Sequence, residues 1–153
     1  RGIPQIYYGS EIGMTGKKEV GDGDIRRDFP GGWPKDTQNA FSENGRVSKQ
    51  AKYYDFSKKL IQWRKTNAAI HFGKTLHYVP RDDVYVYFRY TDDERVMIIV
   101  NNNTLDQKIS LNRYSEGIAG RTQAFEIISK AAFKLPEVLK IKAETTLIFE
   151  LSL

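Results

Sequence analysis

Four side chains in one short segment could together bind a small polar ligand. Arg27 and Asp28 supply charged hydrogen-bond donors and acceptors side by side, and Phe29 and Trp33 supply aromatic rings just after them. Hydroxyl groups can bind the first pair, and an apolar ring face can stack on the second. The alternative is that Arg27 and Asp28 only tie the segment down while the rings anchor it.

Metal binding and Cys chemistry have little support in the sequence. The chain has no Cys, which excludes disulfides, thiolate metal sites and Cys nucleophiles. His71 and His77 are the only histidines, and they lack the spacing of metal ligands. Residues 22–24 (DGD) could begin a calcium loop but lack the further oxygen ligands of a full motif. We therefore expect no cofactor here, with calcium left open only for a longer parent protein.

The composition is that of a globular protein. Of the 153 residues, 40% are hydrophobic and 28% are charged, and the net charge is +5. The basic residues are scattered among acidic ones, whereas a nucleic-acid binder concentrates them on one face. The longest obvious apolar run, Val96 to Val100, is far shorter than the roughly 20 residues that span a bilayer. We therefore expect neither nucleic acid nor a membrane among the partners.

The elements that must position the four side chains lie on either side of them. Residues 2–9 are short, apolar and closed by Gly, which is typical of a strand buried in a parallel sheet. Residues 13–45 lack periodicity and predict a long loop, a feature that is usually functional. A helix is expected over residues 49–66, with Asn67 closing it in a left-handed conformation. Its aromatic stripe is interpreted as a packing face, formed by Tyr53, Phe56, Leu60 and Trp63.

The second half of the chain alternates between apolar and polar side chains in about seven short segments. The clearest pair is residues 84–90 and 95–100, joined by a hairpin turn at residues 91–94. Short alternating segments with turn signals between them predict an antiparallel β-sandwich over residues 74–153. Seven apolar side chains are expected inside it: Val86, Phe88, Ile98, Val100, Phe125, Leu147 and Phe149.

The first half is not a complete fold, because one parallel strand and one helix cannot bury a core. We therefore interpret residues 1–73 as the last strand-loop-helix unit of something larger, followed by a self-sufficient β domain. The start at Arg1, without an initiator Met, fits a boundary or a cut at that point. A strand without its neighbours should either self-associate through residues 3–8 or become irregular there.

Three segments resemble glycoside hydrolase family 13, the α-amylase family. Residues 2–11 (GIPQIYYGSE) closely resemble its eighth barrel strand, and residues 60–65 (LIQWRK) resemble the end of its eighth helix. Residues 26–33 (RRDFPGGW) resemble the neopullulanase and cyclomaltodextrinase branch, and the strands that follow resemble the family's C-terminal antiparallel domain. The resemblance thus covers the whole chain.

The resemblance implies an α+β fragment. Residues 1–73 would end a catalytic (β/α)8 barrel as strand 8, active-site loop and helix 8, and residues 74–153 would form a C-terminal Greek-key β-sandwich. The parent would cleave or transfer α-glucosidic linkages of starch-like or maltodextrin substrates with retention, using two carboxyl groups about 5–5.5 Å apart. In the family these groups follow earlier strands, so no catalytic residue is expected here and the fragment alone should be inactive.

The same resemblance gives the candidate site its ligand. The loop after strand 8 lies on the active-site face of a barrel, so Arg27, Asp28 and Trp33 are the expected contacts to an α-glucan or maltooligosaccharide. A rival reading is a stand-alone carbohydrate-binding β-sandwich that uses Tyr85 and Tyr87 as a sugar platform, although such a module needs no strand-loop-helix before it. Linkage preference, hydrolysis versus transfer and the compartment stay open, with the periplasm or the cell exterior favoured.

Overall fold

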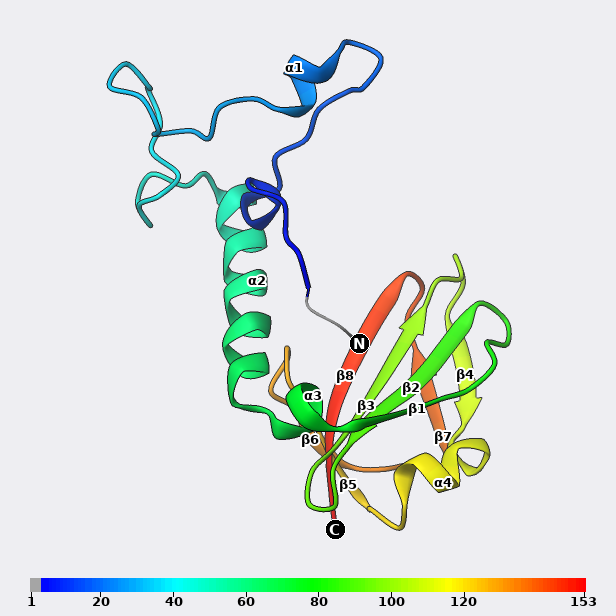
Figure 1. Cartoon of the computed structure of the whole chain (residues 1–153). Helices are drawn as coiled ribbons and strands as arrows, with labels where there is room; N and C mark the ends of the chain where they lie inside the picture. Colours follow the sequence, from blue (N-terminus) through cyan, green and yellow to red (C-terminus); the bar gives the residue numbers. More distant parts are fainter. Residues whose placement is uncertain (1–3) are drawn as a thin grey trace. The chain divides into compact units, whose positions relative to one another are not determined.

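The computed structural model describes residues 4–153, which fold into two compact units, residues 4–61 and 62–153 (Figure 1). The helices are η1 (Ser10–Ile12), α1 (Asp22–Ile25), α2 (Ser48–Thr66), α3 (Ala68–Phe72), η2 (Leu111–Tyr114) and α4 (Ser115–Ile118). The strands are β1 (Lys74–His77), β2 (Val84–Tyr90), β3 (Arg95–Asn101), β4 (Gln107–Ser110), β5 (Gln123–Glu126), β6 (Ala132–Lys134), β7 (Val138–Ile141) and β8 (Thr145–Ser152). Among these described helices, none is both long and apolar enough to cross a bilayer.

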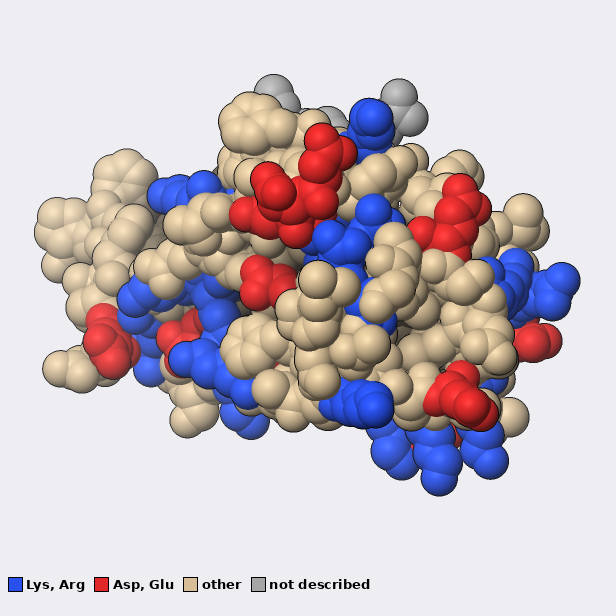
Figure 2. All heavy atoms as spheres, turned by 90° about the horizontal axis from the view of Figure 1, so that it is seen from below, with Lys and Arg blue, Asp and Glu red and all other residues tan. Residues whose placement is uncertain are grey.

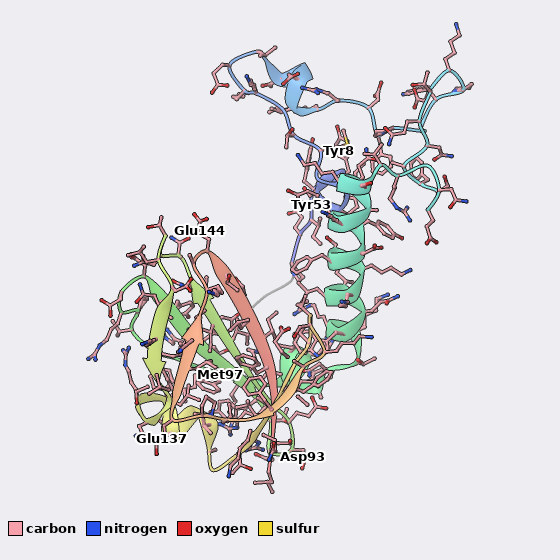
Figure 3. All side chains as sticks on the ribbon, turned by 180° about the vertical axis from the view of Figure 1, so that it is seen from behind. Tyr8, Tyr53, Asp93, Met97, Glu137 and Glu144 are labelled. Carbon is pink, nitrogen blue, oxygen red and sulfur yellow. The ribbon has the colours of Figure 1, made fainter. Side chains whose placement is uncertain are left out.

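The second unit is built from antiparallel strands in two sheets. The larger sheet has six strands in the order β1-β2-β3-β8-β5-β6, and β4 pairs with β7 in a smaller sheet that forms a second layer (Figure 1). Phe88, Met97 and Phe149 are direct cross-strand neighbours at the centre of the core, where Figure 3 labels Met97. Val86 is buried with them and Leu147 is partly buried. The antiparallel β domain that the sequence predicts is therefore confirmed.

The prediction that Ile98 and Val100 point into the main core is wrong, because both lie on the opposite face of the sheet. The segment Val96 to Val100 is apolar at every position, so alternation cannot say which residues face the core. The strand register places Ile99 opposite Val86, and directly opposed residues share a face of the sheet. Ile98 and Val100 consequently lie on the other face, where Ile98 is buried and Val100 is partly buried.

Phe125 was expected inside and is 38% exposed, because β5 is turned the other way. Ala124 and Glu126 point inward instead. Burial of the Glu126 carboxylate is tolerated because backbone N–H groups of Ile128 and Ser129 donate to it at 3.2 and 2.6 Å. Alternation predicted that Phe125 faces the core, but the hydrogen-bonded carboxylate of Glu126 lies on the core side of β5 instead.

A smaller apolar cluster covers part of the outer face of the larger sheet. Ile98 packs there with Ala69 of α3, and Trp63 lies against both. The indole N–H of Trp63 donates to Oε1 of Glu150 in β8 at 2.6 Å, and the side-chain amide of Asn67 donates to the same oxygen at 3.2 Å. The segment that precedes the sandwich is thereby fastened to its central strands.

Helix α2 matches the predicted helix, but two expectations about it are wrong. Asn67 does not close it in a left-handed conformation; its φ is −96° and its side chain accepts a hydrogen bond from the Ile70 N–H, so it caps α3. Tyr53 and Phe56 are 47% and 50% exposed rather than packed, although Trp63 of the same stripe does pack. No described side chain covers these two rings fully.

The first unit has little regular structure before α2. The strand expected at residues 2–9 begins outside the described residues, and in its described part, residues 4–9, no strand is present. A parallel strand needs backbone partners on both sides, and no described strand lies alongside this segment to supply them. Ile6, Tyr7 and Tyr8 are about half exposed, so the segment is irregular, one of the two outcomes expected for it.

Candidate functional site

The candidate site lies in the loop between η1 and α2, in the first unit. Its base is η1, which Gly9 and Gly13 flank with left-handed φ angles of 82° and 67°. A Cβ on Gly13 would lie only 2.5 Å from Cδ2 of Tyr53, so the glycine is needed for this close approach. Figure 3 shows Tyr8 and Tyr53 at this end of α2. The loop is therefore seated against the first turns of the helix.

Arg27 is held by both its side chain and its main chain. Its Nε donates to Oδ1 of Asp24 at 3.0 Å, and the two groups form an ion pair. The phenol of Tyr8 donates to the Arg27 carbonyl at 3.1 Å, and these side chains line a small hollow of about 60 Å³. The Lys17 N–H donates to Oδ2 of Asp24 at 2.5 Å. That bond, more than the guanidinium of Arg27, lowers the pKa of Asp24 and keeps the carboxylate ionised beside the arginine.

Asp28 differs from its neighbour because its carboxylate is uncommitted. The side chain is exposed, and within residues 4–153 it accepts no hydrogen bond and forms no ion pair. A free carboxylate next to a fixed guanidinium offers acceptors and donors to an incoming hydroxyl-bearing ligand. The use of Arg27 and Asp28 as ligand contacts stays a prediction.

Trp33 stands on a turn that Asp36 organises. The carboxylate of Asp36 accepts N–H groups of Gly31 and Trp33 at 2.7 and 3.2 Å through one oxygen, Oδ2. The indole is 61% exposed, so its ring faces are available. Within the described residues, no hydrogen bond, ion pair or ring contact joins Trp33 to Arg27 or Asp28. Arg27 and Asp28 are therefore neighbours in the chain, and Trp33 is a separate element of the same loop.

Sequence reasoning missed Phe41. Its ring lies 4.5 Å from the ring of Phe29, and it is 65% exposed. The N–H of Ala40 donates to the carbonyl of Pro30 at 2.9 Å, which brings these two parts of the loop side by side. The only sequence signal was a large apolar residue in a polar loop, which does not by itself identify a neighbour.

The acidic residues of the possible calcium loop serve ion pairs. Asp22 pairs with Lys18 and, at 3.5 Å, with Arg26, while Asp24 pairs with Arg27. In residues 4–153, no group of three His, Asp or Glu side chains is placed to hold a metal ion.

Two features of the surface bear on the rival readings. On the face that Figure 2 shows, basic and acidic side chains are interspersed. In the sandwich, the rings of Tyr85 and Tyr87 stack on each other with centroids 5.3 Å apart and planes 26° apart. Burial raises the pKa of Tyr87, which packs against the outer apolar cluster of the sheet. The stack covers one face of each ring and leaves the other, so the stand-alone carbohydrate-binding reading stays an alternative.

Comparison with known proteins links both units to carbohydrate enzymes. Residues 75–150 match the family model of the cyclo-malto-dextrinase C-terminal domain. A cyclomaltodextrinase of Thermoanaerobacter pseudethanolicus is 32% identical over 113 residues, which is 72% of this chain and 17% of that protein. A cyclomaltodextrin glucanotransferase of Niallia circulans is 34% identical over 103 residues, which is 67% of this chain and 12% of that protein. The chain thus spans less than a fifth of the length of these curated relatives.

A solved structure extends the likeness in fold beyond the sandwich. The α-amylase of Geobacillus thermoleovorans, complexed with acarbose, superposes with a TM-score of 0.70 at 22% identity, covering 98% of this chain and 30% of that one. At this identity the likeness concerns the fold alone. Sequence matches and fold agree, and the chain belongs to the α-amylase family of glycoside hydrolases, glycoside hydrolase family 13, with a cyclomaltodextrinase-type C-terminal domain at residues 75–150.

Proposed function

We propose that this chain is the C-terminal part of a retaining α-glucan hydrolase or transglycosylase acting on α-glucosidic linkages of starch-like or maltodextrin substrates. The observation that carries the proposal is the match of residues 75–150 to the cyclomaltodextrinase C-terminal domain. In this proposal, residues 1–73 are strand 8, active-site loop and helix 8 of a (β/α)8 barrel, and residues 74–153 are the C-terminal β-sandwich. The likeness to the α-amylase over 98% of the chain supports this division.

The chain's own share of the reaction is substrate binding. Retaining hydrolysis needs a nucleophile and an acid whose carboxyl groups lie about 5–5.5 Å apart, and in our proposal both come from barrel segments outside this chain. Of the two carboxylates beside Arg27, Asp24 is already committed to the arginine and the Lys17 amide. Asp28 remains free to accept hydrogen bonds. The loop can therefore bind a glucan, while this chain alone is expected to be inactive.

Each candidate side chain has a defined role in that binding. A guanidinium has five N–H donors, and Asp24 fixes its orientation while leaving donors for sugar hydroxyls. Asp28 accepts from further hydroxyls, and the exposed indole of Trp33 stacks on an apolar sugar face. The expected partner is an α-glucan or maltooligosaccharide. Self-association of the isolated chain through residues 3–8 also belongs to the proposal, and the half-exposed Ile6, Tyr7 and Tyr8 support it.

Substitution of Asp28 tests the proposal in the complete protein that contains this chain. Asp28→Asn removes a charged acceptor, and a hydrogen bond to a charged group is worth about 1.5–3 kcal/mol. We therefore expect kcat/KM on maltoheptaose to fall about tenfold or more. Asp92→Asn, at an exposed aspartate in the β2–β3 turn, is the matched control and should change nothing. Wild-type kinetics for the Asp28→Asn protein would remove Asp28 from the substrate site.

A further inference from the structure

Two phenylalanine rings contact each other in the loop that carries the candidate sugar contacts. Phe29 directly follows Asp28 in the chain, and its ring lies 4.5 Å from that of Phe41, with 41° between the planes. Phe29 is half-buried, whereas Phe41 is 65% exposed. The pair thus presents an aromatic surface to solvent. The charged residues Arg27 and Asp28 directly precede Phe29 in the chain. The sequence suggests stacking for Phe29, but neither the sequence nor the family match assigns a role to Phe41 or to the pair.

The backbone under this pair is held in place before any ligand arrives. Arg46 donates from Nη1 to the carbonyls of Ala40 and Phe41, at 3.1 and 3.3 Å. Its guanidinium carbon lies 3.8 Å from the centre of the Tyr54 ring, so the same side chain stacks on helix α2. Arg46 therefore fastens the returning part of the loop to the helix. A surface fixed in this way loses little conformational freedom when it binds.

We propose that Phe29 and Phe41 form a stacking subsite for one glucosyl unit of the α-glucan, with Arg46 as its positioning residue. This inference rests on the proposed function and deepens it. A sugar is favoured over a protein partner because Phe29 directly follows Arg27 and Asp28 in the chain, so that one short segment supplies an aromatic ring, a guanidinium and a carboxylate without a hydrogen-bond partner among the described residues. The buried centre of a protein interface is depleted in carboxylates such as that of Asp28, whereas a pyranose has both an apolar face and a rim of hydroxyls.

The test is a kinetic comparison of Phe41→Ala with Phe72→Ala in the complete protein. Phe72 is 85% exposed on α3, so the control removes a phenylalanine that is even more exposed than Phe41 and lies far along the chain from the loop. We expect Phe41→Ala to raise KM for maltoheptaose about three- to tenfold with kcat unchanged, since stacking stabilises ground and transition states alike. Thermal unfolding should not change, which distinguishes lost substrate contact from lost packing against the barrel segments outside this chain. Phe41→Tyr should restore the wild-type KM, and Phe72→Ala should leave it unchanged.

Arg46 supplies the second arm of the test. Arg46→Ala should raise KM to a similar extent, and the double variant with Phe41→Ala should be no worse than either single one, because both act on one surface. An active protein whose KM ignores Phe41→Ala, or whose kcat falls instead, overturns the subsite and leaves the proposed function standing. A complete wild-type protein without any activity on α-glucans overturns both.

Discussion

Glu126 is a buried carboxylate whose charge is stabilised by the turn that follows it. It is 6% exposed, and this burial by itself raises its pKa. Hydrogen bonds from Ser129 and Ile128 outweigh burial, so the pKa lies below its ordinary value of 4.5. The folded protein consequently binds this proton less tightly than the unfolded chain. The charge stabilises the fold above the unfolded pKa, and that contribution is lost as the pH falls through the folded pKa.

Glu126→Gln should therefore destabilise the protein by about 1–2 kcal/mol at pH 7, because a charged acceptor is replaced by a neutral one. The difference from wild type should shrink as the pH falls below 4.5, because the carboxyl of the unfolded chain becomes protonated there and that of the folded protein only at lower pH. Urea unfolding followed by circular dichroism at a series of pH values measures this. Glu137→Gln, at an exposed glutamate, serves as the control and should follow the wild-type curve. Parallel stability curves for wild type and Glu126→Gln would show that the buried charge contributes nothing.

The elements of the sandwich differ in how far the sequence could predict them. The β2–β3 hairpin was predictable because β2 alternates cleanly and Thr91 and Glu94 close a polar turn, with the Thr91 N–H bonded to the Glu94 carbonyl at 2.9 Å. The inward face of β3 could not be predicted, because that strand is apolar on both sides. Only its register with β2 determines which side chains face the core. β5 was inverted because the burial of Glu126 depends on amides of the next turn, which alternation does not contain.

The candidate site, like the sandwich, could be predicted from the sequence only in part. Residue type within one loop segment was enough to propose Arg27, Asp28 and Trp33 as ligand contacts, and that assignment stays a prediction. The Phe29–Phe41 contact depends on the pairing of Ala40 with Pro30 across a loop without periodicity, so neither propensity nor alternation indicates it. Side-chain hydrogen bonds to backbone groups, such as those of Arg46, shape this loop, and such bonds are visible only in three dimensions.

Packing of α4 onto the sandwich can be tested at Gly117. A Cβ at this position would lie 2.3 Å from Cε2 of Phe88, a central core side chain, so the glycine allows the helix to approach the ring. Gly117→Ala should destabilise the protein by about 1–3 kcal/mol, as overpacking does. Gly23→Ala is the control, because no atom lies within 4 Å of the added methyl group. Equal urea midpoints for Gly117→Ala and wild type would mean that α4 does not pack as described.

At the scale of the whole molecule, the two units are unequal in what they bury. Within residues 4–61 the buried hydrophobic side chains are Ile12 and Ala40, whereas the second unit has a continuous core on one face of its large sheet and a smaller cluster on the other. A unit with so little buried apolar surface gains little from folding by itself. This contrast supports the proposal that the first unit is completed by other parts of a barrel, while the sandwich is largely complete.

The most direct test of this account is α-glucan hydrolysis measured side by side for the 153-residue chain and for the complete protein that contains it. Both are purified identically, incubated with maltoheptaose, and assayed for shorter products against a blank. We predict that the complete protein cleaves or transfers α-glucosidic linkages and that the chain alone does neither, because the proposed function places the catalytic carboxyl pair outside it. Product formation by the chain alone above the blank, or an inactive complete protein, would contradict the account.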